Sequence, residues 1–548
     1  MVNLGPSKGC QTCKQRRIKC DEGKPSCERC LRVGRQCGGY SKKPVIIRFR
    51  EDTIKESAIE QAQKSPHQRQ QVLVARKPSL VPALSPVQRD VALAFFLGHF
   101  ATTGRDFESA RGFFEVLSPV VAKEAPSSAI STAVTAIATR MHTLWRDGAT
   151  ASPSTNCLQT HSLALKRLQQ ALKDHKELTS QTTVLAALVL QFYENISAAW
   201  KRRRPASTHH EGAVALLMSQ LSTNKSHAGY GGHLLAYILH NEVSSALSEQ
   251  RPVPSRIRSW INDDKIPLNP STTLDIIGIS IANVQTRFLR LLAQDNLDPA
   301  LSQRDLEEVW NDLRSIDDDL MGWMKTLPRD WRPFKMRHVE KTSPPIATYS
   351  RSYDIYPSVQ IAAVWNTWRC YRLMLLRIAL ILIHDRPDAL PLKASNVDCF
   401  STELPIISWV EDSIQELFDS VCESVPFHLG NCTRRSTLYD FADTSIVFPS
   451  YHDLPPHDAV FLEHLSSDRF MSSEDHRHHV IVLGSWHILS PLGYLLQMFS
   501  SEYSNLLSKT IRRGQKEWIY QQMIRATAVL DMEPMKKPET DRATPVLI

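Results

Sequence analysis

Residues 9–37 read GCQTCKQRRIKCDEGKPSCERCLRVGRQC, and this stretch holds six of the eleven cysteines of the 548-residue chain. The spacing is C-x2-C-x6-C-x6-C-x2-C-x6-C, which divides into two similar halves. Two residues between cysteines let both thiolates reach one tetrahedral metal ion from the first turn of a helix. The pattern therefore predicts a metal centre whose ligands are Cys10, Cys13, Cys20, Cys27, Cys30 and Cys37.

Two zinc ions account for this number of cysteines. Six thiolates fill the eight positions around two tetrahedral zinc ions only if two of the thiolates bridge. About thirty residues cannot build a hydrophobic core of their own, so metal binding and folding are expected to be a single event. A disulfide knot and a different soft metal such as copper are the alternatives. The first residues of the chain show no apolar export signal, so we expect reduced thiols inside the cell and favour zinc.

The positive charge of the chain is concentrated in the same region. The whole chain has a net charge of +8, whereas residues 1–50 alone carry +10 and the remaining residues −2. Any electrostatic affinity for a polyanion therefore belongs to the N-terminal segment. The most apolar stretch, residues 373–383, is too short for a bilayer and contains Arg377, so we expect no membrane span.

The cysteine spacing, the basic run KQRRIK and Pro25 together resemble the fungal zinc binuclear cluster (six-cysteine) DNA-binding domain. The resemblance implies two helix–loop units, two Zn²⁺ ions bridged by Cys10 and Cys27, and Pro25 as the loop proline. It also implies that the first helix enters the major groove of double-stranded DNA and reads a CGG-type triplet.

By this resemblance the DNA-binding residues are Arg17 and Lys19 as base readers, with Lys14, Gln15 and Arg16 at phosphates. The chemistry agrees, because arginine can donate two hydrogen bonds to O6 and N7 of guanine. The other cations would neutralise phosphates and make affinity fall steeply with salt. Arg17 stands where the family commonly has lysine, which leaves the order of half-sites open.

Beyond the cluster the chain divides by composition. We predict a DNA-binding domain over 1–40, a largely disordered linker over 41–86, an all-α domain over 87–530 and a flexible tail over 531–548. The linker contains Pro66 and several further prolines, and its short helical stripe ends before them. The body shows helical periodicity, for example Leu165, Leu168 and Leu172, and few period-two strands. The fold class is thus mostly all-α.

Segments over about 160–220, and more loosely Trp365–Arg377, resemble the regulatory middle region behind zinc clusters in fungal transcription factors. This resemblance implies dimerisation, effector response or restraint of activation. The weak heptad signal in residues 41–60 leaves both a monomer and a homodimer open.

Enzyme signatures in the body are unconvincing, so we predict no catalytic residues and no enzyme. His210–Glu211 begins like a zinc-protease helix, but Val214 replaces the second histidine. The run with His476, His478 and His479 is interpreted as a partly exposed helix start rather than a metal site. The basic run 201–204 fits a solvated loop slightly better than a nuclear import signal.

The sequence therefore predicts a nuclear DNA-binding transcription factor of RNA polymerase II genes that works with the transcription machinery. Control of a metabolic or secondary-metabolite pathway is a common role for such proteins. The alternative is a ligand-sensing or enzyme-like helical domain that the zinc module tethers to DNA. An apolar cavity with convergent polar groups in the body, taking a small-molecule effector, would favour the alternative.

Overall fold

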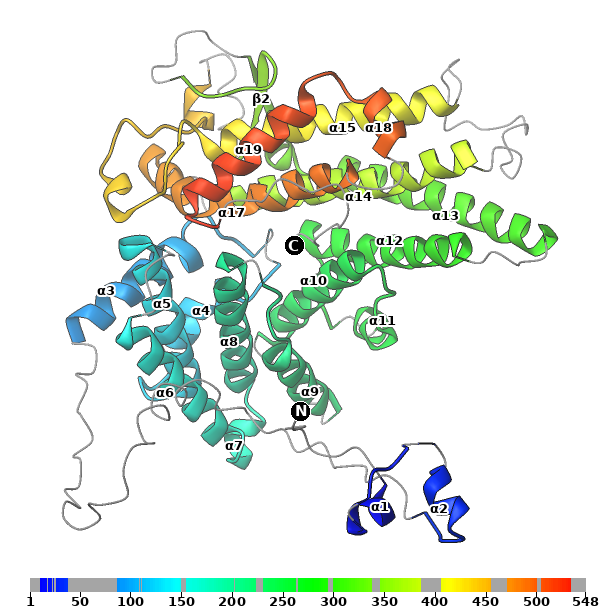
Figure 1. Cartoon of the computed structure of the whole chain (residues 1–548). Coiled ribbons are helices and arrows are strands. Elements are labelled where there is room, and N and C mark those ends of the chain that lie inside the picture. Colours follow the sequence, from blue (N-terminus) through cyan, green and yellow to red (C-terminus); the bar gives the residue numbers. More distant parts are fainter. Residues whose placement is uncertain are drawn as a thin grey trace, which may run out of the picture. The chain divides into compact units, whose positions relative to one another are not determined.

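The computed structural model describes residues 10–37 (except 17, 22, 24 and 25), 86–148 (except 108 and 110), 154–222 (except 202), 230–262, 265–293, 299–337, 345–385, 406–454, 471–499 and 504–533. The chain divides into two compact units, Met1–Ser79 and Leu80–Ile548 (Figure 1). The predicted linker over 41–86 lies outside the described residues except for Pro86, and most of the predicted tail also lies outside them.

Among the described residues, the first unit contributes two short helices and the second unit contributes the other elements. The helices are α1 (Gln11–Gln15), α2 (Glu28–Arg32), α3 (Pro86–Phe96), α4 (Phe114–Val121), α5 (Ala129–Asp147), α6 (Thr155–Ala171), α7 (His175–Leu178), α8 (Gln181–Trp200), α9 (Thr208–Ser222), α10 (Gly231–Glu249), α11 (Ser255–Asn262), α12 (Pro270–Leu292), α13 (Pro299–Thr326), α14 (Val359–Asp385), α15 (Ile406–Leu429), α17 (Ser473–Met498), α18 (Ser504–Thr510) and α19 (Gln515–Val529). A π-helical turn, η1 (Leu97–Thr102), continues α3. The prediction of a mostly all-α fold is confirmed.

Polar residues fix where several of these helices begin. Ser128, Ser154 and Ser180 accept hydrogen bonds from backbone amides in the first turns of α5, α6 and α8. Asn269 forms a capping box ahead of α12, with Pro270 at the first helical position. These side chains replace the hydrogen-bond acceptors that the first turn of a helix lacks.

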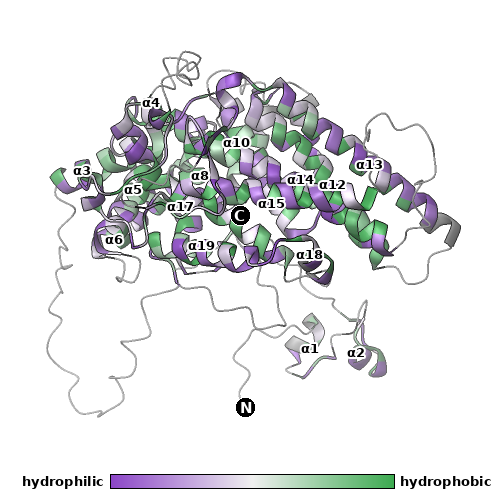
Figure 2. Ribbon diagram, turned by 90° about the horizontal axis from the view of Figure 1, so that it is seen from above, coloured by the Kyte–Doolittle hydropathy of each residue, from purple (hydrophilic) through white to green (hydrophobic). Residues whose placement is uncertain are grey.

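Helix α14 is the centre of the helical body. It is buried on nearly every face and packs against α12, α13, α15 and α17 (Figure 1). Figure 2 shows polar residues along much of α13, whereas α14 beside it is more apolar. Helix α17 is long and apolar enough to cross a membrane, but 72% of its most apolar window is buried inside the body. In this structure α17 is therefore a core helix.

One small sheet interrupts the helices. Strands β1 (Phe334–Arg337) and β2 (Ser352–Ile355) pair antiparallel, with Phe334 opposite Ile355. They fall within residues 87–530, which the sequence analysis predicted to be all-α with few strands. Four residues in each strand are too few for an alternating pattern to be recognised in a sequence.

The histidine run of α17 differs from expectation. Helix α17 begins at Ser473, so the predicted helix start is present. However, His476 is 1% exposed and His479 is fully buried. The His478 side chain is 19% exposed. His476 packs against the rings of Phe427 and Tyr451. The prediction of a partly exposed start was therefore wrong for His476 and His479, because elements distant in sequence cover that face.

Acidification is expected to destabilise the helical body. Burial lowers the pKa of His428 to about 3 and that of His476 to about 4, from an ordinary value of 6.5. The unfolded chain takes up these protons below pH 6.5 whereas the folded chain does not, so stability present above pH 6.5 falls as the pH drops toward 4. We expect a loss of about 1–2 kcal/mol for each imidazole by pH 5, measured by urea unfolding at pH 7 and pH 5.

The substitution His476→Gln should reduce this pH dependence, and His384→Gln is the control because the His384 side chain is 56% exposed. Equal urea midpoints at pH 7 and pH 5 for the unsubstituted protein would contradict the prediction.

Candidate zinc centre and nucleic-acid interface

All six predicted ligands of the N-terminal unit converge on one small volume. Their sulfur atoms form two overlapping groups, in each of which every sulfur lies within 4.8 Å of the others. One group contains Cys10, Cys13, Cys20 and Cys27, and the other contains Cys10, Cys27, Cys30 and Cys37. Cys10 and Cys27 belong to both groups, which is the arrangement that two bridging thiolates require.

The sulfur–sulfur distances fit zinc. Cys10 Sγ lies 3.7 Å from Cys27 Sγ and 3.8 Å from Cys30 Sγ, and Cys13 Sγ lies 3.8 Å from Cys27 Sγ. A tetrahedral ion with Zn–S bonds of about 2.3 Å places its sulfur ligands about 3.8 Å apart. A disulfide would need a sulfur–sulfur distance of about 2.05 Å. The measured distances therefore exclude a disulfide in each of these three pairs of cysteines. The donor set and spacing thus suit two zinc ions.

Each half of the unit positions its cysteines in the same way. Cys27 precedes α2, and its sulfur accepts a hydrogen bond of 3.4 Å from the amide of Cys30. Cys10 precedes α1, and its sulfur accepts a bond of 3.4 Å from the amide of Cys13. The two-residue spacing therefore places a sulfur at each helix N-terminus, where backbone amides and the helix dipole favour the thiolate form.

The protonated cysteines resist ionisation. Burial raises the pKa of the Cys13 thiol to about 12 and also raises the pKa of Cys27. A bound cation supplies the positive charge that offsets this cost, and metal binding accordingly releases protons. Zinc affinity is therefore expected to fall as the pH falls.

Asp21 is a structural residue that the sequence analysis missed. Its carboxylate accepts hydrogen bonds from the amides of Glu28, at 2.9 Å, and Arg29, at 3.3 Å. Both hydrogen bonds lower the pKa of Asp21, and the bond from the Glu28 amide has the larger effect. The side chain thereby ties the loop after Cys20 to the start of α2. Helix-capping residues are recognised in a sequence by their position next to the helix. Asp21 lies seven residues before the Glu28 amide, so the sequence gives no indication of this contact.

A polar and basic surface surrounds the cluster. Gln15, Arg16 and Lys19 are exposed, as a nucleic-acid contact requires. Lys14 lies in α1, its side chain is outside the described residues, and Arg17 itself is outside them. The second half of the unit also carries exposed arginines, Arg29, Arg32 and Arg35. Ile18 packs inward against the cysteines, whereas Lys19 beside it is exposed.

The other candidate residues of the sequence analysis lie in the helical body. His210 Nε2 lies 3.3 Å from Glu242 Oε1, so this histidine links α9 to a carboxylate of α10. Lys201, Arg203 and Arg204 are exposed between α8 and α9, in the predicted loop. Of the scattered cysteines, Cys157, Cys370, Cys422 and Cys432 are buried, and Cys399 lies outside the described residues.

Comparison with known proteins identifies the N-terminal unit. Residues 8–45 match the family model of the fungal Zn(2)-Cys(6) binuclear cluster domain. The chain is 58% identical over 36 residues to an uncharacterized transcriptional regulatory protein of Schizosaccharomyces pombe, a stretch that covers 7% of each chain. It is 58% identical over 33 residues to an aspercryptin biosynthesis cluster-specific transcription regulator of Emericella nidulans, covering 6% of this chain and 5% of that protein.

A third relative is the pestheic acid cluster transcriptional regulator 3 of Pestalotiopsis fici, 56% identical over 36 residues, which cover 7% of this chain and 6% of that protein. The chain thus matches well under a tenth of the length of each of these three relatives. No solved structure matches the chain.

Proposed function

Because residues 8–45 are a fungal Zn(2)-Cys(6) binuclear cluster domain, which binds two zinc ions, we propose that this protein is a nuclear, sequence-specific DNA-binding regulator of transcription by RNA polymerase II. The observation that carries the proposal is the pair of overlapping thiol groups that share Cys10 and Cys27. The two ions would cross-link the two halves of the unit. The unit then holds α1 rigidly enough to enter a major groove.

The segment proposed to contact DNA runs from Lys14 to Lys19. Arg17 would donate two hydrogen bonds to a guanine of a CGG-type triplet, and Lys19 would contact the adjacent base edge. Lys14, Gln15 and Arg16 would bind phosphates, which position the unit but carry no sequence information. The exposure of Gln15, Arg16 and Lys19 leaves these side chains accessible to DNA, which supports the proposal.

The helical body would regulate the DNA-binding unit, through dimerisation, contacts with the transcription machinery or an effector. A homodimer would read two triplets, with residues 41–60 setting their separation. One relative is named as a regulator of the aspercryptin biosynthesis cluster and another as a regulator of the pestheic acid cluster, which supports a role in a metabolic or secondary-metabolite pathway. The alternative function, a ligand-sensing helical domain, is favoured by one cavity of the body, described below.

Replacing Arg17 with alanine is expected to weaken binding to a CGG-containing site by about 10- to 100-fold, since a bidentate arginine–guanine contact provides about 1–3 kcal/mol of discrimination. Binding to unrelated DNA should change much less. The measurement is a titration of labelled duplexes with the full-length protein, together with genome-wide occupancy of both proteins.

The matched control is Arg16→Ala, which should weaken binding to all duplexes alike and lower the slope of log K against log salt by about 1. Both variants must keep two zinc ions. If Arg17→Ala retains the preference for the CGG-containing duplex, Arg17 is not the base reader.

A further inference from the structure

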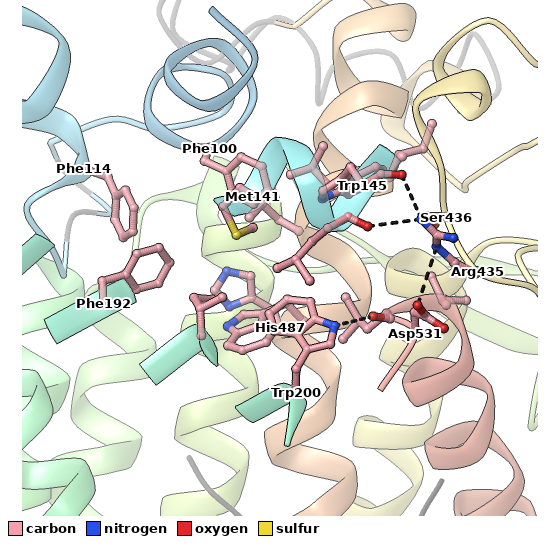
Figure 3. A pocket seen from close by; sticks show the side chains of 18 of the residues that line it. Phe100, Phe114, Met141, Trp145, Phe192, Trp200, Arg435, Ser436, His487 and Asp531 are labelled. Atoms are coloured by element: carbon pink, nitrogen blue, oxygen red, sulfur yellow. Dashed lines mark hydrogen bonds and ion pairs between the residues drawn. The ribbon is translucent and has the colours of Figure 1, made fainter. Parts of the chain in front are cut away.

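A partly open cavity of about 110 Å³ lies in the helical body, lined by residues of α5, α8, α17, the end of α19 and the segments that contain Phe114 and Arg435. Its walls are mostly apolar and come from segments far apart in the sequence (Figure 3). A cavity of roughly 150 Å³ lined by aliphatic and aromatic side chains can hold one benzene molecule. The smaller volume here limits the ligand to at most a single six-membered ring.

Aromatic residues form rigid walls around this space. Trp200 and Trp486 stack with ring centroids 5.5 Å apart, and Trp200 Nε1 donates a hydrogen bond of 2.8 Å to the Leu530 carbonyl. Phe114 and Phe192 pack edge to face with centroids 5.1 Å apart. Such walls favour a planar aromatic ring over a flexible chain, because rings pair well in stacked and edge-to-face arrangements.

The charged groups at the cavity are already paired. Arg105 Nη1 lies 3.2 Å from Glu115 Oε1, and both side chains are nearly buried. Arg435 donates to the carbonyls of Leu144 and Trp145, and its Nε lies 3.8 Å from Asp531 Oδ2. The Arg435 and Asp531 side chains are 30% and 28% exposed, so this pair marks the solvent side of the cavity. No unbalanced charge is left to hold an ionic ligand.

His487 is a further polar group at the cavity. It lines the cavity, and within the described part of the chain no hydrogen bond to its imidazole is found. Figure 3 shows it between the Phe114–Phe192 end and the Arg435–Asp531 end. Burial and the charge of Arg105 lower the pKa of His487 to about 3, which keeps the ring neutral. A neutral imidazole has one nitrogen that accepts a hydrogen bond and one that donates.

We propose that this cavity binds a small, uncharged aromatic molecule with one hydroxyl group, of the phenol class, whose hydroxyl hydrogen-bonds to His487. A single ring suits the size and shape of the cavity, the hydroxyl offers the His487 imidazole a hydrogen-bond partner that the described residues do not provide, and neutrality avoids uncompensated charge. The proposal concerns only the helical body and does not depend on the DNA-binding function of the N-terminal unit.

The test is calorimetric titration of the full-length protein with phenol and with toluene, which has a similar ring but no hydroxyl. Both probes should bind, and phenol should bind about 2- to 10-fold more tightly, the value of one neutral hydrogen bond. In His487→Leu the preference for phenol should disappear while toluene still binds. In Ile196→Phe, where the larger side chain fills the cavity, both probes should be lost.

The matched control is His476→Leu, because His476 is another buried histidine of α17 that does not line the cavity. It should keep the preference for phenol. Failure of both probes to bind, equal affinity for the two, binding that survives Ile196→Phe, or a preference that survives His487→Leu would each overturn the proposal. If His487→Leu does not fold, the comparison of probes in the unsubstituted protein and in Ile196→Phe decides.

Discussion

Replacing Cys27 with alanine is expected to remove both zinc ions from the protein and to abolish sequence-specific DNA binding. Cys27 belongs to both groups of converging thiols, so its loss leaves each group with three sulfur atoms. Structural zinc contributes about 10–16 kcal/mol to the folding of small metal domains, far more than residues 10–37 can supply otherwise. Metal analysis and a duplex titration of the purified full-length variant measure the two effects.

Cys37→Ala is the informative comparison, because Cys37 belongs to only one of the two groups. This variant should keep the four sulfurs of the other group and retain at most about one zinc ion. Cys157→Ala, at a buried cysteine of α6, should keep two. The helical body should give the same circular dichroism in all three variants. Two zinc ions in Cys27→Ala would refute the bridging role.

Replacing Asp354 with alanine is expected to lower the free energy of unfolding of the helical body by about 3–5 kcal/mol. Arg369 Nη2 donates to Asp354 Oδ2 at 2.8 Å, and the two side chains are 2% and 4% exposed. Arg369 also donates to Tyr356, Asn366 and Ser420, each at 2.8 Å. These neutral partners do not cancel its charge, so the variant leaves a buried guanidinium without a counter-ion. Urea unfolding followed by circular dichroism measures the loss.

Asp312→Ala provides a control with the same chemistry on the surface. Asp312 pairs with Arg287, but the two side chains are 51% and 37% exposed. Exposed pairs contribute about 0–1 kcal/mol because water and salt screen them. Similar losses of unfolding free energy in the two variants would show that burial does not determine how much the Arg369–Asp354 pair contributes to stability.

The metal centre could be predicted from the sequence because the information is local. Cys10, Cys13, Cys27 and Cys30 lie at the starts of two short helices, and the spacing within each pair fixes how near their sulfurs come. The same holds for the helices of the body, whose apolar stripes and serine caps, such as Ser180 before α8, act within one turn.

The tertiary structure alone decided which polar groups are buried and where space remains between helices. His476 and His479 share a helix start that looks exposed by sequence, yet residues more than twenty positions away cover them. Asp354 and Arg369 lie on a strand and a helix, and only packing turns their contact into a buried ion pair. The cavity around His487 likewise needs several segments that are distant in the sequence. Burial and cavity shape depend on contacts between separate elements, whereas metal-ligand spacing and helix periodicity depend on neighbours along the chain.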